Sequence, residues 1–338
     1  MPAVTCRFSD GGSFIVEGEV GQNFLEVALS QGVPIRNQCR SGSCLTCLCG
    51  TENGSEPLVL RRGQVTGLLK SDRELGKALC CVSELMSDGE LYFDYPSDET
   101  GPSEVQSFID SVEWIASDAV KLSVELADGD WLDFEPGQYV EISVPSSEEC
   151  RSYSMCSAPE DLPRLEFMIR ILEDGSMSNY LSKFAKVDDV LKLRGPFGKF
   201  VWSGSRASPH LFIAGGTGLS PICSMLQHIR SVSGKKPQMT LSLSCANPDA
   251  MLDLDLLKLL EAWMPTLDLK LSVREENTGG FLTGNALTPI DFESLSPHTE
   301  AYVCGPDGLI KAATEKLLAA GVRPENVFYE RFVATGNT

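Results

Sequence analysis

The stretch that decides the fold of the first part of this chain is Cys39-Arg40-Ser41-Gly42-Ser43-Cys44-Leu45-Thr46-Cys47. It holds three cysteines in the spacing Cys-x4-Cys-x2-Cys. Three thiolates from one tight loop and a fourth from a distant segment can hold a [2Fe–2S] cluster. Small residues between the cysteines leave room for backbone N–H groups to point at the cluster sulfurs. The stretch therefore predicts an iron–sulfur site with Cys39, Cys44 and Cys47 as ligands.

The fourth ligand is expected in Leu79-Cys80-Cys81-Val82, where both cysteines are candidates. A four-cysteine zinc site normally pairs two Cys-x2-Cys units, and only one such pair is present here. Disulfides are rare in the reducing cytosol, where we expect this protein. The pattern thus favours an iron–sulfur cluster over a zinc site or structural thiols.

Around this loop, the first part of the chain differs in composition from the rest. Seven of the 12 cysteines of the whole chain lie in the first 81 residues. The polar stretch at 96–104 is typical of a linker. Residues 1–95 resemble a plant-type ferredoxin domain, whose last ligand lies in a Leu-x-Cys-Val-like segment. The resemblance implies a β-grasp fold and Cys81 as the fourth ligand, since Cys80 takes a position where the family often has Thr or Ala. We expect a domain at 1–96 and a linker at 97–104.

Beyond the linker, the hydrophobic pattern predicts two more domains. Apolar residues alternate with polar ones at 120–126 and at 165–171, which predicts short strands of an antiparallel β-barrel over 105–204. From His210 onward, short apolar strands alternate with helical stretches. This βαβ series predicts a parallel-sheet α/β domain over 205–338.

Two motifs in the predicted barrel carry groups that suit a phosphate-bearing ring cofactor. Arg151-Ser152-Tyr153-Ser154 offers a guanidinium, an aromatic face and a hydroxyl on one strand. Gly175-Ser176-Met177-Ser178 predicts a turn into a helix whose N-terminus attracts anions. Each motif alone is weak, because an ordinary β-turn or helix cap has the same composition.

Two motifs in the last domain suit a nicotinamide cofactor. Gly215-Gly216-Thr217-Gly218-Leu219-Ser220-Pro221 stands between a strand and a helix, the context of a phosphate-binding turn, although it departs from Gly-x-Gly-x-x-Gly by ending in Pro221. Cys304-Gly305-Pro306 follows another strand, at the carboxyl edge where such sheets bind ligands. The aromatic segment 328–332 near the chain end suits either a core or the cover of a ring system.

Taken in this order, the motifs resemble those of the ferredoxin–NAD(P)+ reductase family over residues 105–338. The resemblance implies that Arg151 meets the flavin phosphates, that Tyr153 lies against the isoalloxazine, and that Ser154 reaches its N5 edge. Implied FAD contacts also include Gly175, Ser178 and Phe332. The implied nicotinamide contacts are Gly215, Gly216, Thr217, Gly218, Pro221, Cys304, Gly305 and Pro306. Ser154 and Cys304 are the expected catalytic residues.

The turn after the second strand of the last domain bears on the choice between NADH and NADPH. Its residues are Ala246-Asn247-Pro248-Asp249, and no Lys or Arg follows Cys245 until Lys258. A 2′-phosphate calls for a basic residue there, whereas an acid such as Asp249 suits a free 2′-hydroxyl. An Asn-Pro-Asp turn without any cofactor role has the same sequence. The absence of a base still favours NADH.

The three predicted cofactors define an electron path. NADH gives up a hydride, a [2Fe–2S] cluster takes one electron at a time, and FAD can do both. The expected path is therefore NADH to FAD to cluster to a protein partner. A ferredoxin placed before a flavin reductase resembles the electron-transfer components of bacterial oxygenases, and length and motifs match best the reductases of benzoate and toluate 1,2-dioxygenase. This resemblance implies a terminal oxygenase as partner.

Two alternatives stay open at this point. The reductases of di-iron monooxygenases, such as phenol or methane hydroxylase, have the same domain order. A sensor that binds FAD or a cluster without turnover would carry the same motifs. The chain is not expected to be the oxygenase itself, because its only histidines, His210, His228 and His298, supply neither Rieske ligands nor a facial triad.

Charge and hydropathy exclude several other classes. The net charge of −19 argues against a nucleic-acid partner. The sequence has no run of eighteen apolar residues, so it predicts no membrane span. The start Met1-Pro2-Ala3-Val4 does not resemble a secretory signal. We therefore expect a cytoplasmic protein without a membrane partner.

Overall fold

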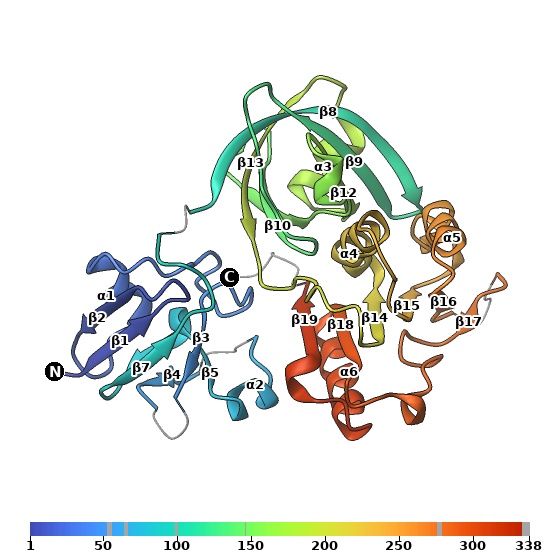
Figure 1. Cartoon of the computed structure of the whole chain (residues 1–338). Coiled ribbons are helices and arrows are strands. Elements are labelled where there is room, and N and C mark those ends of the chain that lie inside the picture. The colour runs from blue at the N-terminus through green and yellow to red at the C-terminus, as the bar shows by residue number, and fades with distance from the viewer. Residues whose placement is uncertain (53–55, 64–66, 99–100, 146, 276–278, 333–338) are drawn as a thin grey trace. The chain divides into compact units, whose positions relative to one another are not determined.

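The structure is a computed structural model that describes residues 1–52, 56–63, 67–98, 101–145, 147–275 and 279–332 (Figure 1). The chain divides into two compact units, Met1–Gly101 and Pro102–Thr338, and each is described by itself. The expected linker at 97–104 spans this division, and its residues 99 and 100 lie outside the described residues, as does the end of the expected last domain at 333–338.

The first unit is a mixed five-stranded sheet with a helix packed on it. The strand order is β2-β1-β7-β3-β5. The strands are β1 (Ala3–Arg7), β2 (Ser13–Glu17), β3 (Leu48–Thr51), β5 (Lys77–Leu79) and β7 (Gly89–Tyr92). Helix α1 (Phe24–Ser30) starts at Asn23, whose side chain accepts the Glu26 N–H at 3.1 Å, and it buries Phe24 and Leu25. This arrangement confirms the β-grasp fold expected for the ferredoxin part.

Shorter elements complete the first unit. They are the two-stranded sheet of β4 (Leu58–Leu60) and β6 (Ser83–Leu85), helix α2 (Lys70–Glu74) and the 3-10 turn η1 (Cys80–Val82). Strands β3 and β5 pair antiparallel, with Leu48 opposite Leu79. This register places the end of the cysteine loop directly beside the cysteine doublet.

The second unit begins with the expected antiparallel barrel. Its sheet has the order β11-β10-β13-β8-β9-β12, and every pairing in it is antiparallel. A bridge between Met155 and Phe167 joins the first and last strands. The elements are β8 (Ser103–Ala116), β9 (Ala119–Leu126), β10 (Tyr139–Ser143), β11 (Cys150–Ser154), β12 (Arg164–Arg170), α3 (Ser176–Lys183) and β13 (Val190–Phe197). Alternating apolar side chains fill the interior, as their period of two requires.

The rest of the second unit is a six-stranded parallel sheet of order β17-β16-β15-β14-β18-β19. The strands are β14 (His210–Gly215), β15 (Met239–Cys245), β16 (Leu267–Val273), β17 (Leu282–Thr283), β18 (Glu300–Gly305) and β19 (Val327–Arg331). The helices are α4 (Leu219–Ser231), α5 (Leu254–Trp263) and α6 (Asp307–Ala319), and the 3-10 turns near the edges include η3 (Gly216–Gly218) and η4 (Pro248–Ala250). The strand order reverses between β14 and β18, which creates a topological switch point.

Barrel and parallel sheet touch at defined places inside the second unit. Lys121 on β9 forms an ion pair at 3.1 Å with Asp253, the residue whose side chain caps α5. Ser220 on α4 donates to the carbonyl of Ser154 on β11 at 2.7 Å. The two parts are thereby fixed against each other at the carboxyl end of β14. Among the described residues, no helix is long and apolar enough to cross a membrane.

Candidate functional site

The loop between α1 and β3 wraps its backbone around the sulfur of Cys39. The Ser41 N–H donates to this sulfur at 3.5 Å and the Cys44 N–H at 3.4 Å. The tight path needs left-handed backbone at several positions, which are Arg40, Gly42 and Leu45. Amide donors aimed at a ligand sulfur stabilise negative charge on it, and so favour the reduced form of a cluster.

The four cysteines expected as ligands stand in two pairs. Cys44 hydrogen-bonds the sulfur of Cys39 and lowers the pKa of that thiol to about 3. Cys47 hydrogen-bonds the sulfur of Cys81 and lowers its pKa, and the Cys81 N–H donates to Cys47 Sγ at 3.4 Å. Within the described ranges, no three His, Cys, Asp or Glu side chains gather where one metal ion could sit. Two separate pairs suit two irons with two thiolates each, and they do not suit mononuclear zinc.

The structure separates the two cysteines of the doublet. They lie in η1, so their side chains point in different directions. Cys81 points to Cys47, whereas the Cys80 thiol is fully buried and donates to Cys49 Sγ at 3.7 Å. Cys80 therefore lies in the core behind the loop, and Cys81 lies with the other three candidates.

Gly67 is a contributor to this site that the sequence analysis missed. Its N–H donates to the carbonyl of Gly42 at 2.6 Å. A Cβ atom at Gly67 would lie 2.8 Å from that carbonyl oxygen and 3.0 Å from the carbonyl oxygen of Ser43. Only glycine allows this close approach, which fixes the loop from the side of α2. No signal in the sequence distinguishes it from the other glycines.

In the barrel, the structure brings two of the expected flavin motifs together through a third residue. The Arg151 guanidinium contacts Glu149 Oε2 at 2.8 Å, and the hydroxyl of Ser176, at the start of α3, hydrogen-bonds the same carboxylate oxygen. An arginine and a helix N-terminus thus converge on one anionic oxygen. A flavin phosphate oxygen has the same charge and demands the same donors, so these residues fit the group.

Gly175 and Ser178 shape the turn that begins α3. Ser178 is buried, and its hydroxyl accepts the N–H of Leu172 at 3.0 Å. A Cβ atom on Gly175 would lie 2.7 Å from this hydroxyl oxygen, so the glycine makes room for it. The structure therefore uses the Ser178 hydroxyl inside the turn, while Ser176 faces Arg151 through Glu149. Tyr153 is half-buried two residues from Arg151, on the same face of β11.

Ser154 has a partner that the sequence analysis missed. Its hydroxyl donates to Glu330 Oε2 at 3.2 Å, across 176 residues of chain. Burial raises the pKa of the Glu330 carboxyl to about 8, although the Ser154 hydrogen bond acts in the opposite direction. At pH 7, Glu330 therefore holds a proton beside Ser154. Glu330 lies on β19 of the parallel sheet and Ser154 on β11 of the barrel, so no local pattern predicts their contact.

We expect Glu330→Gln to stabilise the protein increasingly as the pH rises from about 4.5 to about 8. The folded form holds this proton up to about pH 8, while the unfolded chain releases it near the ordinary pKa of 4.5. Folding stability of the wild type then falls with pH by at most about 1.4 kcal/mol per pH unit, and the neutral amide escapes this loss. Thermal unfolding of both proteins across this pH range measures the difference. An unchanged difference between pH 5 and pH 8 would contradict it.

At the switch point of the parallel sheet, the two glycine motifs lie against each other. Gly216 has a φ of 55°. A Cβ atom on Gly218 would lie 2.4 Å from the carbonyl oxygen of Cys304, so glycine is required where α4 begins against β18. A Cβ atom on Gly305, which has a φ of 147°, would lie 3.2–3.3 Å from the backbone of Gly215. Thr217 lies between these glycines in η3, and Pro221 is buried in the first turn of α4, where its missing N–H has no helical partner to lose.

The remaining expected residues lie beside these glycines. Phe332 donates its N–H to the carbonyl of Gly305 at 3.0 Å, and its half-buried ring packs against the core of the parallel-sheet domain. Pro306 precedes α6 directly. The Cys304 side chain is fully buried and burial raises the pKa of its thiol, so the carbonyl of Cys304, rather than its sulfur, faces the turn at Gly218.

Asp249 lies exposed in η4 after β15, and the backbone of Arg274 contacts the start of that turn. The N–H of Arg274 donates to the carbonyls of Cys245 and Ala246, both at 3.2 Å. Arg274 follows β16, which pairs with β15 in parallel, so both strands end at the same edge. Arg274 is distant from Cys245 in the sequence and comes near this turn only because β15 and β16 are neighbours in the sheet.

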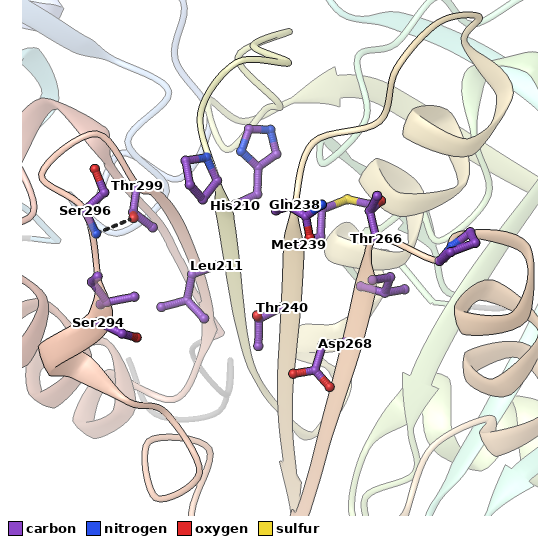
Figure 2. Close-up of a pocket in the computed structure, with 14 residues that line it drawn as sticks. His210, Leu211, Gln238, Met239, Thr240, Thr266, Asp268, Ser294, Ser296 and Thr299 are labelled. Atoms are coloured by element: carbon purple, nitrogen blue, oxygen red, sulfur yellow. Dashed lines mark hydrogen bonds between the residues drawn. The ribbon is translucent and has the colours of Figure 1, made fainter.

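A surface pocket lies at the amino ends of the strands of the same sheet, opposite the ends that carry the glycine motifs (Figure 2). It is lined by the first residues of β14, β15 and β16, among them His210, Met239 and Leu267, and by Thr299. Ligands of such sheets bind at the carboxyl ends of the strands. This pocket therefore lies at the opposite ends of the strands from Gly215 and Gly305.

Comparison with known proteins finds matches along both units of the chain. Three protein-family profiles match: a 2Fe-2S iron-sulfur cluster binding domain at residues 8–86, an oxidoreductase FAD-binding domain at 107–202 and an oxidoreductase NAD-binding domain at 212–315. These matches establish the three cofactors of the protein as a [2Fe–2S] cluster, FAD and a nicotinamide dinucleotide.

Three individual proteins illustrate the likeness. The toluate 1,2-dioxygenase electron transfer component of Pseudomonas putida is 30% identical over 335 residues, which cover 98% of each chain. The phenol 2-monooxygenase reductase component of a Pseudomonas species is 27% identical over 330 residues, 94% of this chain and 91% of that protein. The crystal structure of an Amycolatopsis cytochrome P450 reductase covers 98% of this chain and 99% of its own, with a TM-score of 0.70 at 23% identity, which shows a shared fold.

Proposed function

Since this chain belongs to the family of electron-transfer reductase components that serve aromatic dioxygenases and monooxygenases, we propose that its own partner is a benzoate- or toluate-type 1,2-dioxygenase and that its reductant is NADH. The likeness to the toluate 1,2-dioxygenase component over 98% of both chains carries this proposal. The second candidate is a di-iron phenol-type monooxygenase, favoured by the likeness to the phenol 2-monooxygenase reductase component.

Oxygen uptake distinguishes the two partners. The purified chain is mixed with NADH and with either a benzoate or toluate dioxygenase or a phenol monooxygenase, each with its own aromatic substrate. We expect substrate-dependent oxygen consumption with the dioxygenase at several times the rate obtained with the monooxygenase. Faster consumption with the phenol monooxygenase would reverse the assignment.

At the cluster, we propose Cys39 and Cys44 as the ligands of one iron and Cys47 and Cys81 as those of the other. The pairwise contacts of these thiols support this assignment. The N–H groups of Ser41 and Cys44 hold the sulfur of Cys39 in place. The bound cluster supplies one-electron transfer to the partner protein.

At the flavin, we propose that Arg151 and the N-terminus of α3 hold the phosphates, with Gly175 and Ser178 shaping that turn. Tyr153 and Phe332 supply aromatic faces for the ring. FAD supplies the step from hydride to single electrons. We assign Ser154 Oγ to the reactive edge of the ring. The protonated Glu330 carboxyl beside Ser154 Oγ is the proposed proton source there.

At the switch point, we propose that residues 215–218 with Pro221 hold the phosphates of the nicotinamide cofactor, and that Cys304, Gly305 and Pro306 border its nicotinamide. The N-terminus of α4 favours negative charge there, and the close packing of Gly218 on Cys304 opens the backbone to it. We assign Asp249 to the ribose 2′-hydroxyl of this cofactor.

NADH should be preferred to NADPH by about tenfold or more, because a 2′-phosphate beside Asp249 meets one unfavourable contact of about 1.4 kcal/mol. Replacing both Asn247 and Asp249 by arginine should narrow the ratio of kcat/KM for the two cofactors. Arg274→Ala removes the neighbouring base and is the matched test. It should increase the ratio of kcat/KM for NADH to kcat/KM for NADPH. A wild-type ratio near one would contradict the assignment of Asp249.

Delivery to the oxygenase should depend on the rim of the cysteine loop. Arg36 precedes the cysteines of this loop and Arg40 lies between them, where its exposed side chain donates to Asn37 Oδ1 at 3.1 Å. Arg40→Glu should slow oxygenase turnover severalfold, with a smaller effect at high salt, because exposed charges mainly steer encounter. NADH-driven reduction of small dyes should stay unchanged.

The control for this prediction is Arg323→Glu, an equal charge reversal at an exposed arginine of the second unit. It should leave both activities unchanged. Equal loss of oxygenase turnover and dye reduction in Arg40→Glu would place the defect inside the reductase and overturn the docking role.

A further inference from the structure

The hairpin of β8 and β9 extends from the barrel to the parallel-sheet domain, where its tip contacts the turn that carries Asp249 (Figure 1). The tip is the two-residue turn Ser117-Asp118, between the paired residues Ala116 and Ala119. The Ser117 N–H donates to the carbonyl of Asp249 at 2.7 Å. A turn of the flavin barrel therefore holds the backbone of the residue that we assign to the ribose of the nicotinamide cofactor.

Two more contacts hold the other end of this turn. The Asp253 N–H donates to the carbonyl of Ile115 at 3.3 Å. Lys121 Nζ forms an ion pair with Asp253 Oδ2 at 3.1 Å, and the two side chains are only 20% and 10% exposed. Because water screens this pair little, it holds the two parts together more strongly than a surface pair does. One hairpin thus fixes residues 249–253 at both ends.

The tip is itself held firmly in the barrel. Arg170 Nε donates to Asp118 Oδ2 at 3.0 Å, and the Ile171 N–H donates to the Asp118 carbonyl at 2.8 Å, so the tip is tied to the end of β12. Ala119, the first residue of β9, is fully buried in the core of the parallel-sheet domain. The tip therefore acts as a fixed support for the turn.

The contacts inside the Asp249 turn shape it locally. The Asn247 side chain accepts the Ala250 N–H at 2.9 Å, and the Met251 N–H donates to the carbonyl of Pro248 at 3.1 Å. Asp249 itself is exposed, so the place of its carboxylate depends on the place of its backbone. The bond from Ser117 fixes that backbone against a second element.

We propose that the hairpin tip is a positioning element for the nicotinamide cofactor, and that the Ser117 N–H and Lys121 set the preference for NADH by holding the Asp249 carboxylate where it meets the ribose 2′-hydroxyl. The proposal rests on the proposed assignment of Asp249 and adds determinants of cofactor choice from the flavin barrel. A hydroxyl–carboxylate hydrogen bond requires an O···O distance of about 2.5–3.0 Å, so a small displacement of the turn weakens it.

Ser117→Pro tests the backbone contact in the full-length holoprotein. Proline removes the N–H, and its ring carbon displaces the Asp249 carbonyl, while the second position of common β-turns favours proline. Steady-state reduction of a small dye is measured with NADH and with NADPH. We expect the KM for NADH to rise severalfold at unchanged kcat, because the glycine motifs at the switch point stay in place. The KM for NADPH should not rise.

Asp128→Pro is the matched control, because it puts proline at the same position of the turn at the other end of β9. Asp128 is exposed, and this turn is closed by the Asp130 N–H, which donates to the carbonyl of Ala127 at 3.0 Å. This variant should keep the KM values of the wild type for both cofactors. A wild-type KM for NADH in Ser117→Pro, or an equal rise for NADH and NADPH, would overturn the positioning role.

Lys121 gives a second test that leaves the backbone of the hairpin unchanged. Lys121→Gln removes the charge that faces Asp253, and Lys121→Arg keeps it. Lys121→Gln should lower the ratio of kcat/KM for NADH to kcat/KM for NADPH severalfold, and Lys121→Arg should retain most of the wild-type ratio. FAD content and thermal unfolding show whether each variant is folded. If Ser117→Pro loses FAD, a wild-type ratio in Lys121→Gln overturns the proposal.

Asp249→Asn, measured in the same assay, separates this inference from the assignment on which it rests. We expect a raised KM for NADH in Asp249→Asn as well as in Ser117→Pro. A raised value in Asp249→Asn beside wild-type values in Ser117→Pro and Lys121→Gln would overturn the role of the hairpin and leave the assignment of Asp249 in place. An unchanged KM for NADH in Asp249→Asn would overturn both.

Discussion

Cys81→Ser should leave the protein without its normal iron–sulfur absorbance, whereas Cys80→Ser, one residue away, should keep it. Cys81 pairs with Cys47, so its loss removes one of the two thiolates proposed for one iron. Cys80 points into the core toward Cys49, and serine there replaces only a buried S–H donor. Visible absorption and iron content of the two purified variants measure the result.

FAD provides the internal control for this pair. The motifs proposed for the flavin lie in the second unit, so FAD should stay bound and reducible by NADH in both variants. Cys39→Ser, Cys44→Ser and Cys47→Ser should resemble Cys81→Ser. Loss of the cluster from Cys80→Ser and its retention in Cys81→Ser would show that the fourth ligand is misassigned.

Arg151→Ala should weaken FAD binding by about 1.5–3 kcal/mol, or about ten- to 150-fold in Kd, because it removes a charge-assisted phosphate contact. Glu149→Gln is its matched partner. The Glu149 carboxylate contacts Arg151 and Ser176, where we place a flavin phosphate, so it competes with the cofactor. Removing its charge should leave FAD binding at least as tight as in the wild type.

Fluorescence titration of the FAD-free proteins measures both dissociation constants. The opposite response of the two variants is the informative result, since a merely structural ion pair between Arg151 and Glu149 would make both substitutions weaken binding alike. Wild-type affinity in Arg151→Ala would remove the arginine from the phosphate site.

The fold was predictable from the sequence wherever local pattern and topology agree. Alternation at 120–126 and 165–171 predicted strands that the structure places in β9 and β12, where they pair along their whole length. The βαβ rhythm after His210 predicted a parallel sheet, because helices between strands permit little else. The cysteine spacing predicted a tight loop, and the amides around Cys39 show how that loop closes.

Features created by contacts across the sheets were not predictable. Glu330 on β19 meets Ser154 on the barrel strand β11, a contact between two different sheets. The backbone of Arg274 lies beside that of Ala246 because the parallel strands β15 and β16 end at the same edge. The directions of the Cys80 and Cys81 side chains follow from the 3-10 turn η1. Two adjacent cysteines in the sequence do not predict such a turn. The role of Gly67 depends on its approach to Gly42, which no local signal encodes.

The electron path itself is tested most directly by mixing the wild-type protein with NADH in the absence of oxygen and following flavin and iron–sulfur absorbance over time. We predict that both absorbances bleach rapidly, the flavin first, and that in Cys81→Ser only the flavin bleaches. Spectra that remain unchanged after NADH is added would contradict the account and indicate a protein that binds these cofactors without passing electrons.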